Sequence, residues 1–247
     1  MPQIVRQSGF DFSALRVIVV EDNETNRRIV CRMMRQLQCA VVESAADGYD
    51  ALTTIQASTH GYDLIISDFQ MPGMNGLELL KQVRLGAPGI SREIGFIMLT
   101  GHADKFIVGT AFNLNVDCFV VKPVTPKALR VRISHVMSTT NPIKRPIDYS
   151  EISVNPAEIA APKSAPREIV FVSPPWESEN VDNAGIVERD LSNVKPGSKL
   201  AADLHSGSGD LLLPSGQTLD EQTLDRLRNL AELDATVSRL MVREAAR

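Results

Sequence analysis

The chain has 247 residues and a formal net charge of −4; 43% of its residues are hydrophobic and 23% are charged. These values are typical of a globular protein long enough for two small domains, and they exclude a wholly disordered chain, a collagen and a coiled coil. The longest apolar run, around residues 17–20, falls far short of the roughly 18 residues that a membrane helix needs, so we expect no membrane span.

Strand and helix patterns alternate over the first half of the chain. Apolar runs of strand length occur at 15–20, 40–42, 62–67, 94–99 and 119–121. Apolar residues at helical spacing predict helices around 29–37, at 47–57, 76–85 and 104–114, and from an N-cap at Thr125 to about residue 137. Five strands alternating with five helices predict an α/β domain with a parallel sheet covered by helices on both faces.

A proline-rich segment follows this domain. Seven of the 14 prolines lie between Asn141 and Pro175. Because proline lacks an amide donor and fixes φ, it disfavours both helix and sheet. We therefore predict a semi-extended linker over 139–189, with one short strand at Glu168–Val172.

The last residues, 190–247, predict a small α+β module. Short strands are expected at Lys199–His205 and 210–213, and a last strand at Val237–Val242. Thr218 and Glu221 have the spacing of a capping box that opens a helix through about Leu233. Residues 139–247 carry a net charge of −5, against +1 for 1–138, so we do not expect this half to bind nucleic acid.

Charged and polar residues stand where the predicted strands end. Glu21 and Asp22 follow the first strand, Asp68 the third, Thr100 the fourth and Lys122 the fifth. The carboxyl ends of parallel strands form the ligand-binding edge of such a sheet. Clustered carboxylates suit Mg²⁺, and a metal with a lysine and a hydroxyl can stabilise charge on a transferring phosphoryl group.

Motifs in this first half resemble those of the receiver domain of bacterial two-component response regulators. The segments VVEDN, SDFQMPGMNG, LTGHAD and DCFVVKP occur in the order and spacing of that family, over about residues 14–138. The resemblance implies a flavodoxin-like, doubly wound five-stranded parallel sheet. It also implies a phosphoprotein that accepts a phosphoryl group from a histidine kinase or a phosphotransfer protein.

The resemblance assigns a role to each residue at the sheet edge. Asp68 is the expected phosphoacceptor, and Lys122 and Thr100 are expected to contact the phosphoryl group. Mg²⁺ is expected to bind Asp22, Asp68, Glu21 and the backbone carbonyl of Gln70. Thr100 and Phe119 occupy the switch positions, although core packing alone also explains Phe119, and Pro123 occupies a cis-proline position. Two residues depart from the family pattern: Gly101 replaces an alanine, and Asn115 replaces a glycine at a left-handed helix end.

These observations predict four segments: an N-terminal extension (1–13), a receiver domain (14–138), a proline-rich linker (139–189) and a C-terminal module (190–247). The module resembles a small β-rich module found beside receivers and HD-GYP domains, but it lacks the metal-binding residues of the latter. We predict a phosphorelay response regulator that switches protein contacts. It would be a signalling protein whose only enzymatic activities are self-phosphorylation and self-dephosphorylation. Its expected partners are an output protein, which the sequence does not identify, and a second receiver.

Two alternatives stay open. One is a DNA-binding transcriptional regulator with a cryptic output domain, which a gel-shift series over salt would detect. The other is a phosphate shuttle or sink, which the half-life of the acyl phosphate would reveal. Cys31, Cys39 and Cys118 are odd in number and form no CxxC pair, and no apolar signal segment opens the chain, so we expect reduced thiols in a cytoplasmic protein.

Overall fold

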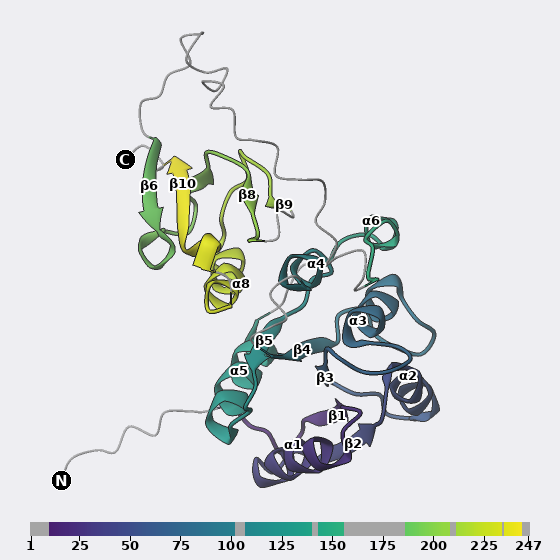
Figure 1. Cartoon of the computed structure of the whole chain (residues 1–247). Helices are drawn as coiled ribbons and strands as arrows, with labels where there is room; N and C mark the ends of the chain where they lie inside the picture. Colours follow the sequence, from purple (N-terminus) through teal and green to yellow (C-terminus); the bar gives the residue numbers. More distant parts are fainter. Residues whose placement is uncertain are drawn as a thin grey trace, which may run out of the picture. The chain divides into compact units, whose positions relative to one another are not determined.

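The computed structural model describes residues 10–101, 107–139, 143–155, 186–207, 211–233 and 235–243 (Figure 1). The chain divides into two compact units, one made of Met1–Ala103 and Asn113–Ile152, the other of Asp104–Phe112 and Ser153–Arg247. Within the described residues, every helix is too short or too polar to span a lipid bilayer. The four-segment division at residues 13, 138 and 189 stays a prediction.

Five parallel strands form the sheet of the first unit. They are β1 (Arg16–Val20), β2 (Val41–Ala45), β3 (Leu64–Asp68), β4 (Gly95–Thr100) and β5 (Cys118–Val121). Their order in the sheet is β2-β1-β3-β4-β5. This is the flavodoxin-like, doubly wound order, so the predicted fold class is confirmed. The second strand is longer than predicted because all five of its residues pair with β1.

Helices follow the strands at the predicted places. They are α1 (Glu24–Gln36), α2 (Gly48–Ala57), α3 (Gly76–Leu85), α4 (Val108–Asn113) and α5 (Pro126–Ser138). Asn23, Asp47, Asn75 and Thr125 cap the N-termini of α1, α2, α3 and α5, each with a side-chain oxygen that accepts a backbone N–H. Part of the predicted helix at 104–114, residues 104–106, lies outside the described residues.

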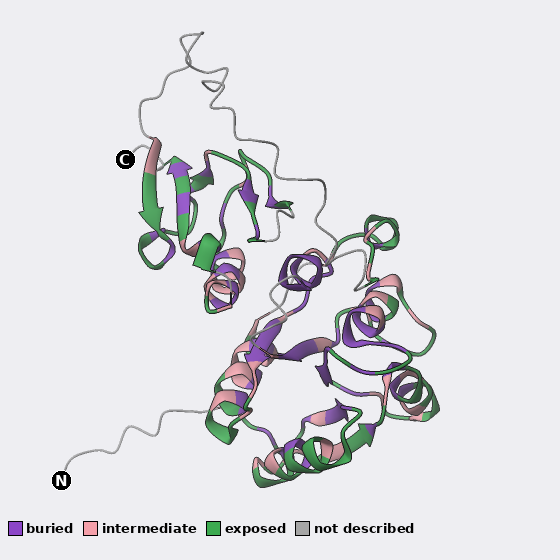
Figure 2. Ribbon diagram, in the orientation of Figure 1, coloured by how far each residue is buried: buried purple, intermediate pink, exposed green. Residues whose placement is uncertain are grey.

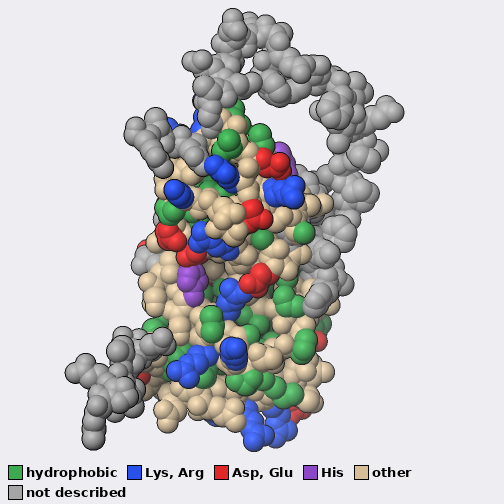
Figure 3. All heavy atoms as spheres, turned by 90° about the vertical axis from the view of Figure 1, so that its left-hand side faces the viewer, with side chains coloured by type: hydrophobic (Ala, Val, Ile, Leu, Met, Phe, Trp, Pro, Cys, Tyr) green, Lys and Arg blue, Asp and Glu red, His purple; other side chains and the backbone are tan. Residues whose placement is uncertain are grey.

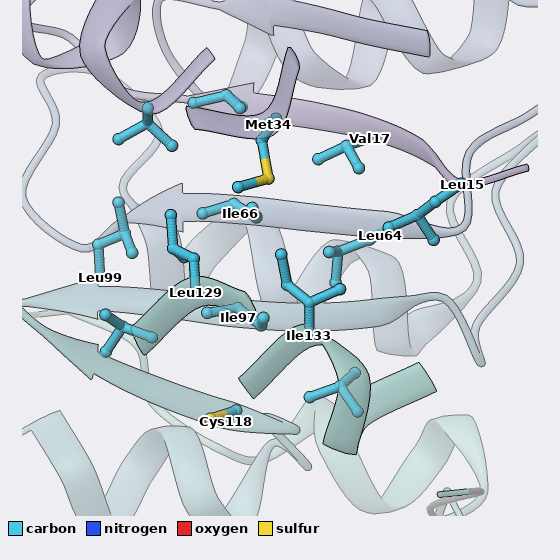
Figure 4. Close-up of a cluster of buried hydrophobic side chains, with 14 of the residues drawn as sticks. Leu15, Val17, Met34, Leu64, Ile66, Ile97, Leu99, Cys118, Leu129 and Ile133 are labelled. Carbon is cyan, nitrogen blue, oxygen red and sulfur yellow. The ribbon is translucent and has the colours of Figure 1, made fainter. Parts of the chain in front are cut away.

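The core lies on both faces of the sheet. On one face, side chains from β1, β3 and β4 pack against Met34 of α1 and against Leu129 and Ile133 of α5 (Figure 4). On the opposite face α2 and α3 contact each other. Central strands such as β1 and β3 are buried along nearly their whole length, whereas the outer faces of α1 and α2 are exposed (Figure 2). Burial on both faces explains why these strands are continuous apolar runs.

Regular structure occurs at both ends of the predicted linker, where the prolines were expected to disfavour helix and sheet. Helix α6 (Pro146–Ser150) belongs to the first unit, and its proline occupies the first helical turn, where no amide donor is needed. Strand β6 (Ile186–Asp190) is free of proline and pairs with a later strand. The predicted strand Glu168–Val172 lies outside the described residues.

The described residues from 186 onward form two small antiparallel sheets and one α-helix. Strands β6, β10 (Arg239–Arg243) and β7 (Lys199–Leu200) make a sheet in the order β6-β10-β7, and β8 (Leu204–His205) pairs with β9 (Leu211–Leu213). Helix α8 (Glu221–Ala231) buries Leu224, Leu227 and Leu230. Short 3-10 turns, η3 (Leu191–Asn193) and η4 (Ala235–Ser238), complete the described part. The predicted mixture of strands and helix is confirmed.

Two details of this part differ from the prediction. The expected strand Lys199–His205 is split into β7 and β8. The capping box of Thr218 and Glu221 is absent, because Thr218 forms a β-bridge with Lys199 and is therefore extended. The helix begins two residues later, where the Asp220 carboxylate accepts the amide of Thr223 at 2.7 Å.

Candidate functional site

The predicted residues at the strand ends meet at one edge of the sheet. Asp68 is the last residue of β3, the central strand, and Thr100 is the last of β4. Lys122 Nζ lies 2.8 Å from Asp68 Oδ1 and 3.0 Å from Glu21 Oε2. The ammonium group of Lys122, which follows β5, therefore contacts the carboxylates at the ends of β1 and β3.

Three carboxylates share this edge. One oxygen of each of Glu21, Asp22 and Asp68 lies within 4.8 Å of the others. Glu21 and Asp68 are buried, with exposed fractions of 1% and 6%, whereas Asp22 is exposed. Three negative charges with one lysine leave an excess of negative charge, and hard carboxylate oxygens that face solvent on one side suit Mg²⁺. The residues present fit that ion.

Burial and neighbouring charges shift two pKa values in the site. Burial raises the pKa of Asp68, and the charge of Glu21 raises it further, against the opposing effect of Lys122. For Lys122, burial alone would lower the pKa, but hydrogen bonds to Asp68 and Glu21 outweigh it and the pKa is raised. Lys122 therefore stays protonated and available to an anionic group at Asp68.

The start of α1 holds the backbone of Glu21 and Asp22 and the carboxylate of Glu21. Arg27 donates from one guanidinium nitrogen to the backbone carbonyls of Glu21 at 2.7 Å and Asp22 at 3.2 Å. Asn26 donates from its side-chain amide to Glu21 Oε1 at 3.2 Å. Neither residue was predicted from the sequence. Only their place in the sequence could have indicated them, because residues in the first turn of a helix lie next to the end of the strand that precedes the helix.

The loop after Asp68 folds back on the end of β3. The amide of Gly76 donates to the carbonyl of Phe69 at 3.0 Å, and Asn75 and Glu78 form a reciprocal capping box at the start of α3. A Cβ atom on Gly76 would lie 2.4 Å from the Asp68 carbonyl oxygen. Glycine is thus required here by close approach of two backbones. Gln70, the expected carbonyl ligand, is exposed two residues after Asp68.

The remaining predicted residues lie on β4, on β5 and just after it. Thr100 is 1% exposed, and its hydroxyl donates to the carbonyl of Gly101 at 3.2 Å. Phe119 is buried on β5, opposite Met98 of β4. The Lys122–Pro123 peptide bond is cis, as the family pattern implies. A largely apolar cavity of about 490 Å³ adjoins the site and is lined by Glu21, Ile29, Val30, Lys122, Pro123 and Val124, among others.

Comparison with known proteins identifies the family. Residues 17–134 match the response regulator receiver domain. Chemotaxis protein CheY1 of Helicobacter pylori strain J99 is 35% identical over 127 residues, which are 51% of this chain and 100% of that protein. The chain belongs to the response regulator receiver family. Chemotaxis protein CheY of Pseudomonas aeruginosa is 30% identical over 127 residues, which are 51% of this chain and 99% of that protein.

The receiver likeness covers only the first half of the chain. A crystal structure of Vibrio cholerae chemotaxis protein CheY4 aligns over 50% of this chain and 98% of that one, with 29% identity and a TM-score of 0.45. Residues 17–134 end before α6 and before the whole C-terminal module. Receiver domains are signalling proteins that bind Mg²⁺ at an acidic site, and this chain has an acidic cluster of Glu21, Asp22 and Asp68.

Proposed function

We propose that this receiver accepts a phosphoryl group on Asp68 and passes the change on to a protein partner. The observation that supports this most is the contact of Lys122 with both Asp68 and Glu21 beside a three-carboxylate cluster. A surface aspartate at a strand end needs neither a half-buried lysine nor two acidic neighbours. A group that must accept and hold a phosphoryl anion needs both charge compensation and a metal site.

In the proposed reaction, an Asp68 carboxylate oxygen attacks the phosphorus atom of a phosphohistidine on the kinase or phosphotransfer partner. The phosphorus–oxygen bond of an acyl phosphate forms, the phosphorus–nitrogen bond breaks, and the imidazole leaves. Lys122 contacts the new phosphoryl oxygens, and the Thr100 hydroxyl turns toward them. Asp22, Asp68, Glu21 and the carbonyl of Gln70 would hold Mg²⁺, which when bound supplies positive charge to the phosphoryl oxygens.

The output of the proposed switch is a change of protein contacts. Thr100 and Phe119 on the neighbouring strands β4 and β5 would move together when charge is added to Asp68. The C-terminal module would serve contacts with an output protein, and a second receiver is the other candidate partner. On the face that Figure 3 shows, Lys and Arg side chains are interspersed with acidic and hydrophobic ones, which supports protein contacts over a phosphate backbone. The proposed setting is the bacterial cytoplasm.

The test is phosphorylation of the full chain by phosphoramidate in the presence of Mg²⁺, followed by intact-protein mass spectrometry. The wild type should gain one acid-stable but base-labile phosphoryl group, and Asp68→Asn should gain none, because the amide is isosteric and is not a nucleophile. Asp22→Asn should need a higher Mg²⁺ concentration, because a charged ligand is lost.

The matched control is Asp50→Asn, the same substitution at an exposed aspartate of α2, whose carboxylate accepts the amide of Ala46. It should be labelled like the wild type. Undiminished labelling of Asp68→Asn would refute the proposed acceptor.

A further inference from the structure

A segment beyond the family match is built into the receiver. We call residues 143–152, which include α6, the strap. Lys81 of α3 donates from Nζ to the backbone carbonyls of Ser150 at 2.8 Å and Ile152 at 2.7 Å. At the other end, Arg92 donates to the carbonyl of Lys144 at 2.6 Å. Both ends of the strap are therefore bound to the domain by charged side chains.

Tyr149 is the buried centre of the strap. Its exposed fraction is 0%. Its hydroxyl accepts the backbone amide of Lys144 at 2.8 Å and donates to Asn115 Oδ1 at 3.1 Å. Asn115 has a φ of 55°, in the left-handed region that favours glycine. Asparagine tolerates this conformation and, unlike glycine, also supplies an acceptor for Tyr149.

The strap thus contacts the turn between α4 and β5. Besides the Tyr149–Asn115 hydrogen bond, Lys144 Nζ donates to the carbonyl of Asn113, the last residue of α4, at 3.1 Å. The same turn is bound to α3, since Arg84 donates to the Asn115 carbonyl at 3.0 Å. The strand that follows the turn, β5, carries Phe119 and leads directly to Lys122.

We propose that the strap couples the phosphoacceptor site to the chain that follows Ile152. This inference rests on the proposed function. The strap makes these hydrogen bonds in the conformation in which Lys122 pairs with Asp68. A phosphoryl group on Asp68 would draw Lys122 and Phe119 to new positions, and β5 would carry that displacement to the Asn115 turn. The bonds to Tyr149 and Lys144 would then weaken and release the start of the following segment.

Coupling of this kind is reciprocal. If a phosphoryl group on Asp68 weakens the contacts of the strap, then weakening those contacts must strengthen the binding of a phosphoryl mimic at Asp68. The probe is beryllofluoride, a phosphoryl mimic, titrated into the full chain with Mg²⁺ by calorimetry. Tyr149→Phe keeps the ring and removes the hydroxyl. It should tighten beryllofluoride binding between about twofold and tenfold, the range that one neutral hydrogen bond allows. Asn115→Gly should do the same, and the double variant should match either single one.

The control is Tyr62→Phe. Tyr62 is also buried, and its hydroxyl donates to Glu43 at 2.6 Å, far from the strap in sequence and outside the Asn115 turn. It should lower stability without changing the affinity for beryllofluoride. If the wild type binds the probe while Tyr149→Phe and Asn115→Gly leave the affinity unchanged, or if Tyr62→Phe tightens it equally, the coupling is refuted. A wild type that binds no beryllofluoride overturns the proposed function itself, and with it the coupling.

Discussion

Arg84 is a charged side chain inside the receiver, with an exposed fraction of 1%. Its guanidinium donates to the backbone carbonyls of Asn115 and Ile94 at 3.0 Å each, and to Asp117 Oδ2 at 3.0 Å. Asp117 also accepts the amide of Phe96 at 2.7 Å. One arginine thus satisfies the polar groups where β4 and β5 begin, and its planar fork suits that task better than a lysine would.

Replacing this arginine should be costly. In Arg84→Met the methionine fills the space, but the Asp117 carboxylate loses its counter-ion while its side chain stays only 9% exposed. We expect the free energy of unfolding to fall by about 3–5 kcal/mol, measured by urea titration followed by circular dichroism. Adding Asp117→Asn should recover part of the loss, because the uncompensated charge is removed. A fall of less than about 1 kcal/mol would show that the ion pair is not needed for stability.

At the scale of single residues, the sequence indicated the side chains at strand ends but not those that support them. Asp68 and Lys122 could be found because parallel strands bring their carboxyl ends to one edge. Arg27 and Arg84 could not, because both donate mainly to backbone carbonyls, and any exposed helical arginine has the same sequence signal. Only the path of the chain around them shows which arginine is buried.

Among the elements, the turn from β3 to α3 places the proposed acceptor. Gly76→Ala should disturb it, because the new Cβ would lie 2.4 Å from the Asp68 carbonyl oxygen and neither backbone can move freely. We expect a loss of about 1–3 kcal/mol in the free energy of unfolding and slower labelling by phosphoramidate. Both are measured on the same preparation, by urea titration and by mass spectrometry over time.

Gly48→Ala is the matched comparison for that variant. Its Cβ would come 2.5 Å from Met74, but the contact is with a flexible side chain that can turn away. We expect a smaller loss of stability and an unchanged rate of labelling. Equal effects of the two substitutions would mean that close approach to the Asp68 backbone does not position the acceptor.

The elements themselves were predictable where one physical signal dominated. Long apolar runs identified the strands of the sheet, and the predicted cap Thr125 begins its helix at the expected place. Helix α6 was not predicted, because prolines indicated a linker there. Pro146 occupies a position in the first helical turn that tolerates proline. The N-cap at Asp220 was also not predicted, because the β-bridge that holds Thr218 extended is a tertiary contact that the local sequence does not reveal.

For the whole molecule, the strap shifts the end of the first folded unit beyond the predicted boundary at residue 138. The family match ends earlier still, at residue 134. Yet Tyr149 is fully buried against the unit, and Lys81 is bonded to the last residues of the strap. A receiver cut at its family boundary would therefore lose part of its own core.

Two truncated chains test this extent. A chain ending after Ile152 should keep the urea midpoint of the receiver transition in the full chain. A chain ending after Ser138 should lose about 3–5 kcal/mol, the usual cost of deleting a large buried aromatic side chain. The loss should come from the missing ring more than from chain length, so Tyr149→Ala in the longer chain should reproduce most of it. Equal midpoints for the two truncated chains would place the strap outside the folded receiver, and would leave Asn115 without a structural reason to differ from glycine.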